Sequence, residues 1–158
     1  MAGKSDYLEN AFLKLLFNAT SDALFASATG SMSNLYCALH TGDPLDSGTQ
    51  TSNEVQTAAY ATYTRVAVAR TSGGFTVTGS SVSPVAAITF PTTSAVGTGC
   101  TATHFSIGEL LTGAGKIFYA GTITPNIVIP ATTAGVIPQL TTATTVTELS
   151  GRGIGMDV

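Results

Sequence analysis

Two long stretches of this 158-residue chain contain no charged side chain, which limits what the chain can fold into. No Asp, Glu, Lys or Arg occurs between Thr71 and Gly108, nor between Ile117 and Thr147. A free domain usually intersperses charges over its surface, and therefore we expect faces of these stretches to lie against other subunits. A β surface coated with Thr and Ser and exposed to water is the alternative.

The uncharged stretches predict a mainly β fold. Short runs rich in β-branched and aromatic residues recur at intervals of about 10 residues and are separated by glycine-rich turns. This pattern predicts a jelly-roll-like β-sandwich, to which one N-terminal amphipathic helix is added. The length suits a single domain, which we place at residues 1–150. The expected strands cover residues 35–40, 63–70, 75–78, 85–90, 101–107, 117–124, 127–129 and 144–149. In the first of them Leu35, Cys37 and Leu39 alternate along one face, and residues 46–54 are expected to form an exposed polar loop.

Both ends of the chain carry candidate contacts to other subunits. Near the N-terminus, apolar residues at helical spacing predict a helix over about residues 6–19. We expect it to bury Leu8, Phe12, Leu15 and Leu16, partly against its own sheet and partly against a neighbour. Residues 151–158 contain three glycines and are predicted to be an arm that a neighbouring subunit holds. The subunit-interface candidates are Tyr7, Leu8, Phe12, Leu16, Arg152, Ile154 and Met156.

Charge and hydropathy exclude several classes of partner. The net charge is −3, and the six Lys and Arg residues are scattered singly, so no basic stripe for direct nucleic-acid binding is expected. No run of roughly 20 apolar residues predicts a membrane span, and residues 1–9 lack the apolar core of a signal peptide. In a reducing cytoplasm, Cys37 and Cys100 are expected to be thiols that pack as small apolar residues.

The residues that could serve in catalysis or metal binding do not form a recognised motif. They are His40, His104, Asp43, Asp46 and Glu109. The sequence lacks Gly-x-Ser-x-Gly, His-Glu-x-x-His and Gly-x-x-x-x-Gly-Lys. A histidine at a strand end that caps the following turn is more frequent than a metal ligand, and the aromatic residues are expected to pack in the core. We therefore predict no catalytic residues, no cofactor and no metal site, and a protein that is not an enzyme.

Several short motifs, taken in order, resemble a family of small structural proteins of tailed-bacteriophage virions, often labelled tail fibre proteins. The resemblance covers the chain from Tyr7 to about Thr124 and implies a structural role in the virion after synthesis in the host cytoplasm. The motifs are Tyr7-Leu8-Glu9-Asn10, Leu35-Tyr36-Cys37-Ala38-Leu39-His40-Thr41-Gly42-Asp43-Pro44, Tyr63-Thr64-Arg65-Val66-Ala67-Val68, Ile88-Thr89-Phe90-Pro91 and Thr103-His104-Phe105-Ser106-Ile107.

Within this class, we expect a capsid cement or decoration subunit that stabilises the assembled phage shell. Such a subunit binds coat protein, other copies of itself, or both, and the binding shifts the equilibrium toward the assembled state. A homo-oligomer within the virion is expected. The alternative is a tail or tail-fibre component, including a host-receptor-binding module. An exposed aromatic cluster or an acidic pocket on the loops would favour receptor binding.

Overall fold

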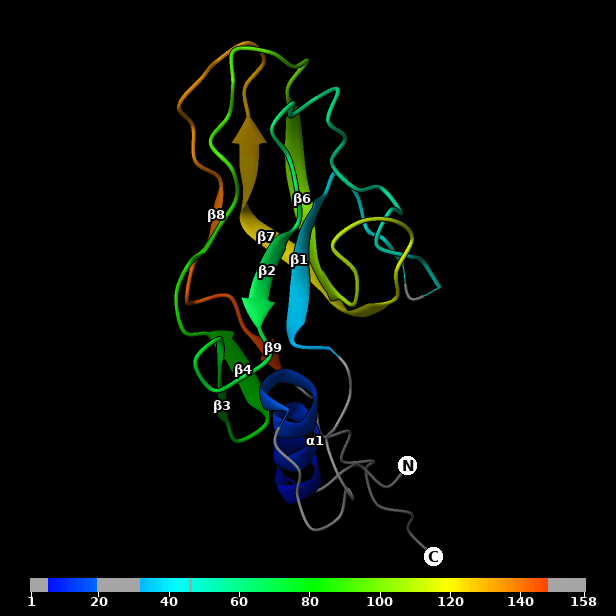
Figure 1. Cartoon of the computed structure of the whole chain (residues 1–158), viewed down its shortest axis with the longest axis vertical. Coiled ribbons are helices and arrows are strands. Elements are labelled where there is room, and N and C mark those ends of the chain that lie inside the picture. Colours follow the sequence, from blue (N-terminus) through cyan, green and yellow to red (C-terminus); the bar gives the residue numbers. More distant parts are fainter. Residues whose placement is uncertain (1–5, 20–31, 46, 148–158) are drawn as a thin grey trace, which may run out of the picture. The chain divides into compact units, whose positions relative to one another are not determined.

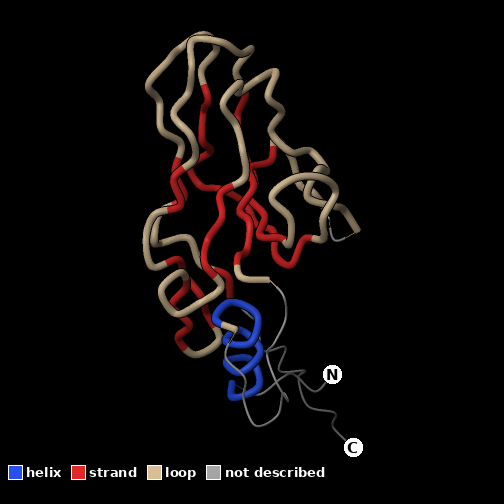
Figure 2. The backbone as a smooth tube through the Cα atoms, in the orientation of Figure 1, coloured by secondary structure: helices blue, strands red, loops and turns tan. Residues whose placement is uncertain are grey.

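The computed structural model describes residues 6–19, 32–45 and 47–147, and of residues 6–9 only the backbone. The chain divides into two compact units. Unit 1 comprises residues 1–33, 69–86 and 142–158, and unit 2 comprises residues 34–68 and 87–141. Figures 1 and 2 show mostly strands and loops, with one helix near the N-terminus. The mainly β class and the N-terminal helix are thus confirmed, while the jelly-roll arrangement and the single domain stay predictions.

The largest sheet has the strand order β2-β1-β6-β7. Its strands are β1 (Asn34–His40), β2 (Val66–Ala69), β6 (Cys100–Gly108) and β7 (Ile117–Ile129). β6 pairs antiparallel with both β1 and β7. The expected apolar face of β1 is confirmed, because Leu35, Cys37 and Leu39 are all fully buried. Ala38 and His40 on the opposite face are buried as well, so the end of this central strand is covered on both sides.

A small second sheet in unit 2 pairs β5 (Ile88–Thr89) with β8 (Gln139–Leu140). The buried Phe90 follows β5, and its ring stacks on that of Tyr63 at a centroid distance of 6.3 Å. Tyr63 in turn receives a hydrogen bond from the Leu39 amide of β1. Aromatic packing therefore joins the segment around β5 to the main sheet, as expected for buried rings.

Unit 1 contains α1 (Asp6–Asn18) and a sheet of order β3-β4-β9. The strands are β3 (Phe75–Thr78), β4 (Ser81–Pro84) and β9 (Val146–Thr147). α1 packs on β3 and β4, and the ring of Phe17 meets that of Phe75 edge-on at 4.9 Å. Ala19 ends the helix in the left-handed region with φ 49°. The guanidinium of Arg70 donates to the carbonyls of Leu15 and Leu16, which satisfies acceptors that a helix end leaves free.

The buried face of α1 differs from the expected one. Leu13 and Phe17 are fully buried, whereas Phe12 is 39% exposed and Leu15 and Leu16 are half-buried. The helix is apolar over much of its circumference, so spacing alone did not select the side that meets the sheet. Phe12 thus lies outside the core of its own subunit, and the expected contact of this helix with a neighbour stays a prediction.

The strand boundaries also bring corrections. β4 and β8 were not expected, and β2 and β5 are shorter than predicted. The two strands expected at 117–124 and 127–129 are one strand, β7, which continues through the exposed Pro125. Pro125 is tolerated there because it lies on an edge strand, at an irregularity in the pairing with β6. No helix in the described part of the chain is long and apolar enough to span a membrane.

Candidate functional site

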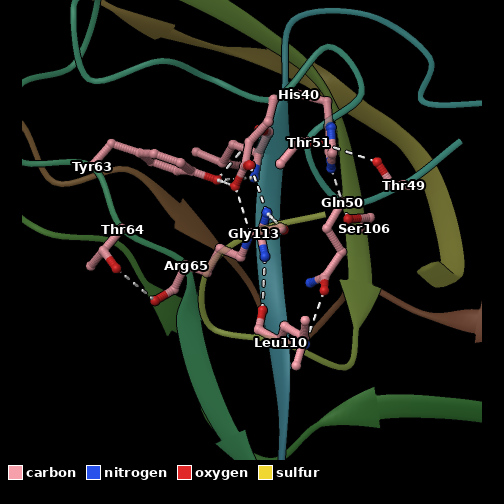
Figure 3. A network of polar contacts seen from close by, with 12 residues as sticks. His40, Thr49, Gln50, Thr51, Tyr63, Thr64, Arg65, Ser106, Leu110 and Gly113 are labelled. Carbon is pink, nitrogen blue, oxygen red and sulfur yellow. Dashed lines mark hydrogen bonds and ion pairs between the residues drawn. The ribbon is translucent and has the colours of Figure 1, made fainter. Parts of the chain in front are cut away.

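The most extensive polar cluster in unit 2 centres on an ion pair between Arg65 and Glu54 (Figure 3). The guanidinium donates from Nε and Nη2 to the two carboxylate oxygens, each at 2.7 Å, in a bidentate arrangement. The two side chains are 3% and 10% exposed. A buried charge is tolerated when it is paired and hydrogen-bonded, as this arginine is.

The same arginine holds the loop of residues 109–116, which joins β6 to β7. Arg65 Nη1 donates to the Leu110 carbonyl at 2.9 Å, and Nη2 donates to the Gly113 carbonyl at 2.8 Å. Arg65 thereby links this loop to Glu54, which lies beside the end of β1 through a bridge with His40. Three segments that are distant in sequence are fixed by one side chain.

Gln50 adds a second link to this loop. Its backbone amide donates to the Gly115 carbonyl at 2.9 Å, and its side-chain oxygen accepts from the Leu110 amide at 2.9 Å. Its side chain is fully buried, and a Cβ at Gly108 or Gly115 would overlap the amide group. Both glycines are required because no larger residue leaves room for Gln50. Among the described residues, Gln50 Nε2 has no hydrogen-bond partner.

Tyr63 completes the carboxylate's surroundings. Its hydroxyl donates to Glu54 Oε1 at 3.0 Å and accepts from the Leu39 amide at 3.0 Å. Burial raises the pKa of Tyr63, and the negative charge of Glu54 raises it further. The phenol therefore stays protonated at physiological pH and serves as a hydrogen-bond donor.

His40, one of the candidate residues for catalysis or metal binding, is buried and hydrogen-bonded within the protein. Nδ1 lies 2.8 Å from the Ser52 carbonyl, which only accepts, so this nitrogen carries the proton. Nε2 of the neutral ring accepts from the Ser106 hydroxyl at 2.7 Å. Burial lowers the pKa of His40. Both ring nitrogens are occupied within the protein, which leaves neither for a substrate or metal.

The structure places the other candidate residues for catalysis or metal binding at separate positions. His104 pairs with Thr122 across β6 and β7, and together with Asp43 it lines a recess of about 320 Å³. Glu109 lies elsewhere and accepts the Lys116 amide within the 109–116 loop. Asp46 lies outside the described residues. Within the described part of the chain, no group of three His, Cys, Asp or Glu residues could hold a metal ion.

The cysteines and the interface candidates are placed as follows. Cys37 aligns with Ile107, seven residues along β6 from Cys100, so about 23 Å separates the two cysteines and both are free thiols. Burial raises the pKa of Cys37 to about 12. Of the interface candidates, Phe12 is exposed and Leu16 half-buried. The side chains of Tyr7 and Leu8, and the whole of Arg152, Ile154 and Met156, lie outside the described part.

Sequence reasoning missed the central members of the polar cluster. Residues 46–54 had been expected as an exposed polar loop, yet Gln50 is fully buried and Glu54 nearly so. Arg65 had been taken only as part of a strand pattern. The one available signal was an arginine and a glutamate within stretches otherwise poor in charge, and it gave no indication that they pair.

The cluster fastens the 109–116 loop to the segments beside the end of β1. Every charged group in the cluster is neutralised by its neighbour, and the histidine is buried.

A family model matches residues 3–149 and is described as podophage GP4 fiber I protein gp80. The chain belongs to this family.

This family membership confirms the resemblance to structural proteins of tailed-phage virions, and the virion is the protein's location after synthesis in the host cytoplasm. A search of curated proteins found no significant match. The tail-fibre alternative fits the family description better than the capsid cement that we had expected.

Proposed function

We propose that the protein is a subunit of a fibre on the phage particle, and that it acts by packing against other virion subunits without a catalytic step. The family match over residues 3–149 carries this proposal. Coat protein, other virion proteins and further copies of the same chain are the expected partners. Capsid cement is the less favoured role, because the family is described by a fibre protein.

The polar cluster supports a role in bearing load. A fibre transmits force between the particle and the surface it meets, so its loops need to be fixed to its sheets. Arg65 and Gln50 together supply four hydrogen bonds to the 109–116 loop. On this fixed loop, Leu110 and Leu111 are 45% and 46% exposed, which suits contact with a neighbouring subunit.

The test is the location and copy number of the protein in purified particles. Antibody-gold labelling or cryo-electron microscopy should place it on a fibre, at far fewer copies than the coat protein. Particles made without it should have capsids of unchanged heat resistance and should adsorb less well to host cells. Labelling over the capsid surface, together with capsids that rupture more readily in its absence, would contradict the fibre assignment and favour cement.

A further inference from the structure

The polar cluster around Arg65 and Glu54 borders a shallow recess in unit 2. The recess has a volume of about 420 Å³ and is lined by residues from three segments, which lie within 51–57, 63–65 and 111–113. Arg65 joins these same segments through its hydrogen bonds to Glu54 and Gly113 (Figure 3). The walls of the recess are therefore fixed before any ligand arrives.

The ion pair that forms part of this lining has unused hydrogen-bonding capacity. Among the described residues, the guanidinium of Arg65 has acceptors for four of its five N–H groups, on Glu54, Leu110 and Gly113. Glu54 Oε2 accepts one hydrogen bond, although a carboxylate oxygen has two acceptor sites. A polar group that is buried without a partner is costly. A ligand that supplies both an acceptor and a donor to this pair is therefore favoured.

Uncharged hydroxyl groups surround the ion pair. Thr57 and Thr112 are exposed and line the recess, and their hydroxyl groups have no hydrogen-bond partner among the described residues. Thr51 and Thr64 add two further hydroxyl groups, and the exposed side chain of Leu111 adds an apolar wall. Each hydroxyl group can donate one hydrogen bond and accept two. The recess thus presents donors and acceptors next to an apolar surface.

The charges at the recess favour a neutral ligand. Glu54 and Arg65 neutralise each other, and of the described residues no other Asp, Glu, Lys or Arg lines the recess. A charged ligand would bring an unpaired charge to two side chains that are nearly buried, which is costly. A neutral molecule that carries several hydroxyl groups on a carbon ring matches the polar sites and the apolar wall together.

We propose that this recess binds a neutral saccharide. Two neighbouring hydroxyl groups of a sugar fit the ion pair, because one oxygen accepts from the remaining N–H of Arg65 while the other hydroxyl donates to Glu54 Oε2. The hydroxyl groups of Thr57 and Thr112 then bind the outer part of the sugar, and the carbon ring packs on Leu111.

A peptide suits this lining less well than a sugar. Peptides in grooves are usually anchored by several apolar side chains, and Leu111 is the one exposed apolar side chain among the described residues of the lining. Leu110, the other exposed leucine of the loop, is not part of the lining and stays available to a neighbouring subunit. The proposal goes beyond the fibre assignment, because it concerns the isolated protein at any location in the virion.

The experiment is a titration of the isotope-labelled full-length protein, followed by its amide NMR spectrum. The probes are methyl α-glucoside, methyl α-galactoside and methyl α-rhamnoside, each up to about 100 mM, so that a dissociation constant in the millimolar range is measurable. At least one of them should cause saturable shifts confined to the amides of residues 51–57, 63–65 and 111–113. N-acetylalanine methylamide serves as a neutral peptide probe and should leave these amides unshifted.

Two variants remove hydroxyl groups from the margin of the recess with little change of shape. Thr112→Val and Thr57→Val should each raise the dissociation constant about threefold to tenfold, because each removes one hydrogen bond to the sugar. Thr101→Val is the matched control, because Thr101 is exposed on β6 outside the lining, and it should bind as the wild type does. The amide spectrum of each variant shows whether it is folded, and Thr57→Val carries the test if Thr112→Val is not.

Several outcomes would overturn the proposal. One is the absence of shifts with all three saccharides at the highest concentration, and another is a set of shifts outside the recess. Equal shifts with N-acetylalanine methylamide would assign the recess to a peptide instead. If the folded Thr112→Val and Thr57→Val variants bind as tightly as Thr101→Val, the saccharide does not use these hydroxyl groups and the assignment fails. Each result leaves the fibre assignment untouched, because labelling of particles tests location alone.

Discussion

Removal of the Glu54 carboxylate should be among the most damaging single changes in unit 2. In Glu54→Ala, Arg65 loses both hydrogen bonds to the carboxylate and keeps those to Leu110 and Gly113. Tyr63 loses its acceptor. Each hydrogen bond to a charged group contributes about 1.5–3 kcal/mol, and breaking a buried pair at one partner costs about 3–5 kcal/mol. Because Glu54 is 10% exposed and water can reach the vacated site, we expect about 3 kcal/mol.

The assay is urea denaturation of the single and double variants. Glu54→Leu with Arg65→Met removes both charges together, and an apolar pair of similar size is often nearly neutral. The carbonyls of Leu110 and Gly113 can then bind water, because both residues are exposed. The double variant should therefore lie within about 1–2 kcal/mol of the wild type and be more stable than Glu54→Ala.

The matched control is Glu109→Ala, which removes a half-exposed carboxylate that accepts a single backbone hydrogen bond. This variant should lose about 1 kcal/mol or less. Our reasoning would be refuted if Glu54→Ala cost no more than the control. If the loss in Glu54→Leu with Arg65→Met equals the sum of the losses in the single variants Glu54→Leu and Arg65→Met, Glu54 and Arg65 act independently.

The remaining predictions concern core packing, the titration of His40, the reactivity of the cysteines and metal removal. Phe17→Ala should destabilise the protein by about 3–5 kcal/mol in chemical denaturation, and Phe12→Ala by about 1 kcal/mol or less; equal losses would place both rings in the core. Burial lowers the pKa of His40 in the folded chain below its unfolded value of about 6.5. The contribution of the neutral, buried ring to stability should therefore be fully present above about pH 6.5 and be lost as the pH falls below it, and thermal melts of His40→Gln should show a smaller loss on acidification. A thiol reagent should not label Cys37 until the chain is unfolded, and should label Cys100 first; rapid labelling of both in the native protein would contradict the burial. EDTA should leave the melting temperature unchanged, and a fall reversed by a divalent ion would reveal a metal site.

The sequence alone predicted the elements whose signals are local. Alternation over residues 35–40 predicted β1 and its buried face, and glycine-rich turns between β-branched runs predicted the mainly β class. The ordered motifs indicated the virion family, which the match over residues 3–149 confirms. These inferences succeeded because side-chain periodicity and turn chemistry are determined by residues close together in the chain.

Only the tertiary structure decided which distant residues meet. Glu54 and Arg65 lie 11 positions apart, and the loop carbonyls that Arg65 binds lie a further 45 and 48 positions away. α1 is apolar on more than one side, and its packing against β3 selected Phe17 over Phe12 as the buried ring. Burial of a polar or apolar group depends on the whole set of surrounding segments, which no local pattern of residues records.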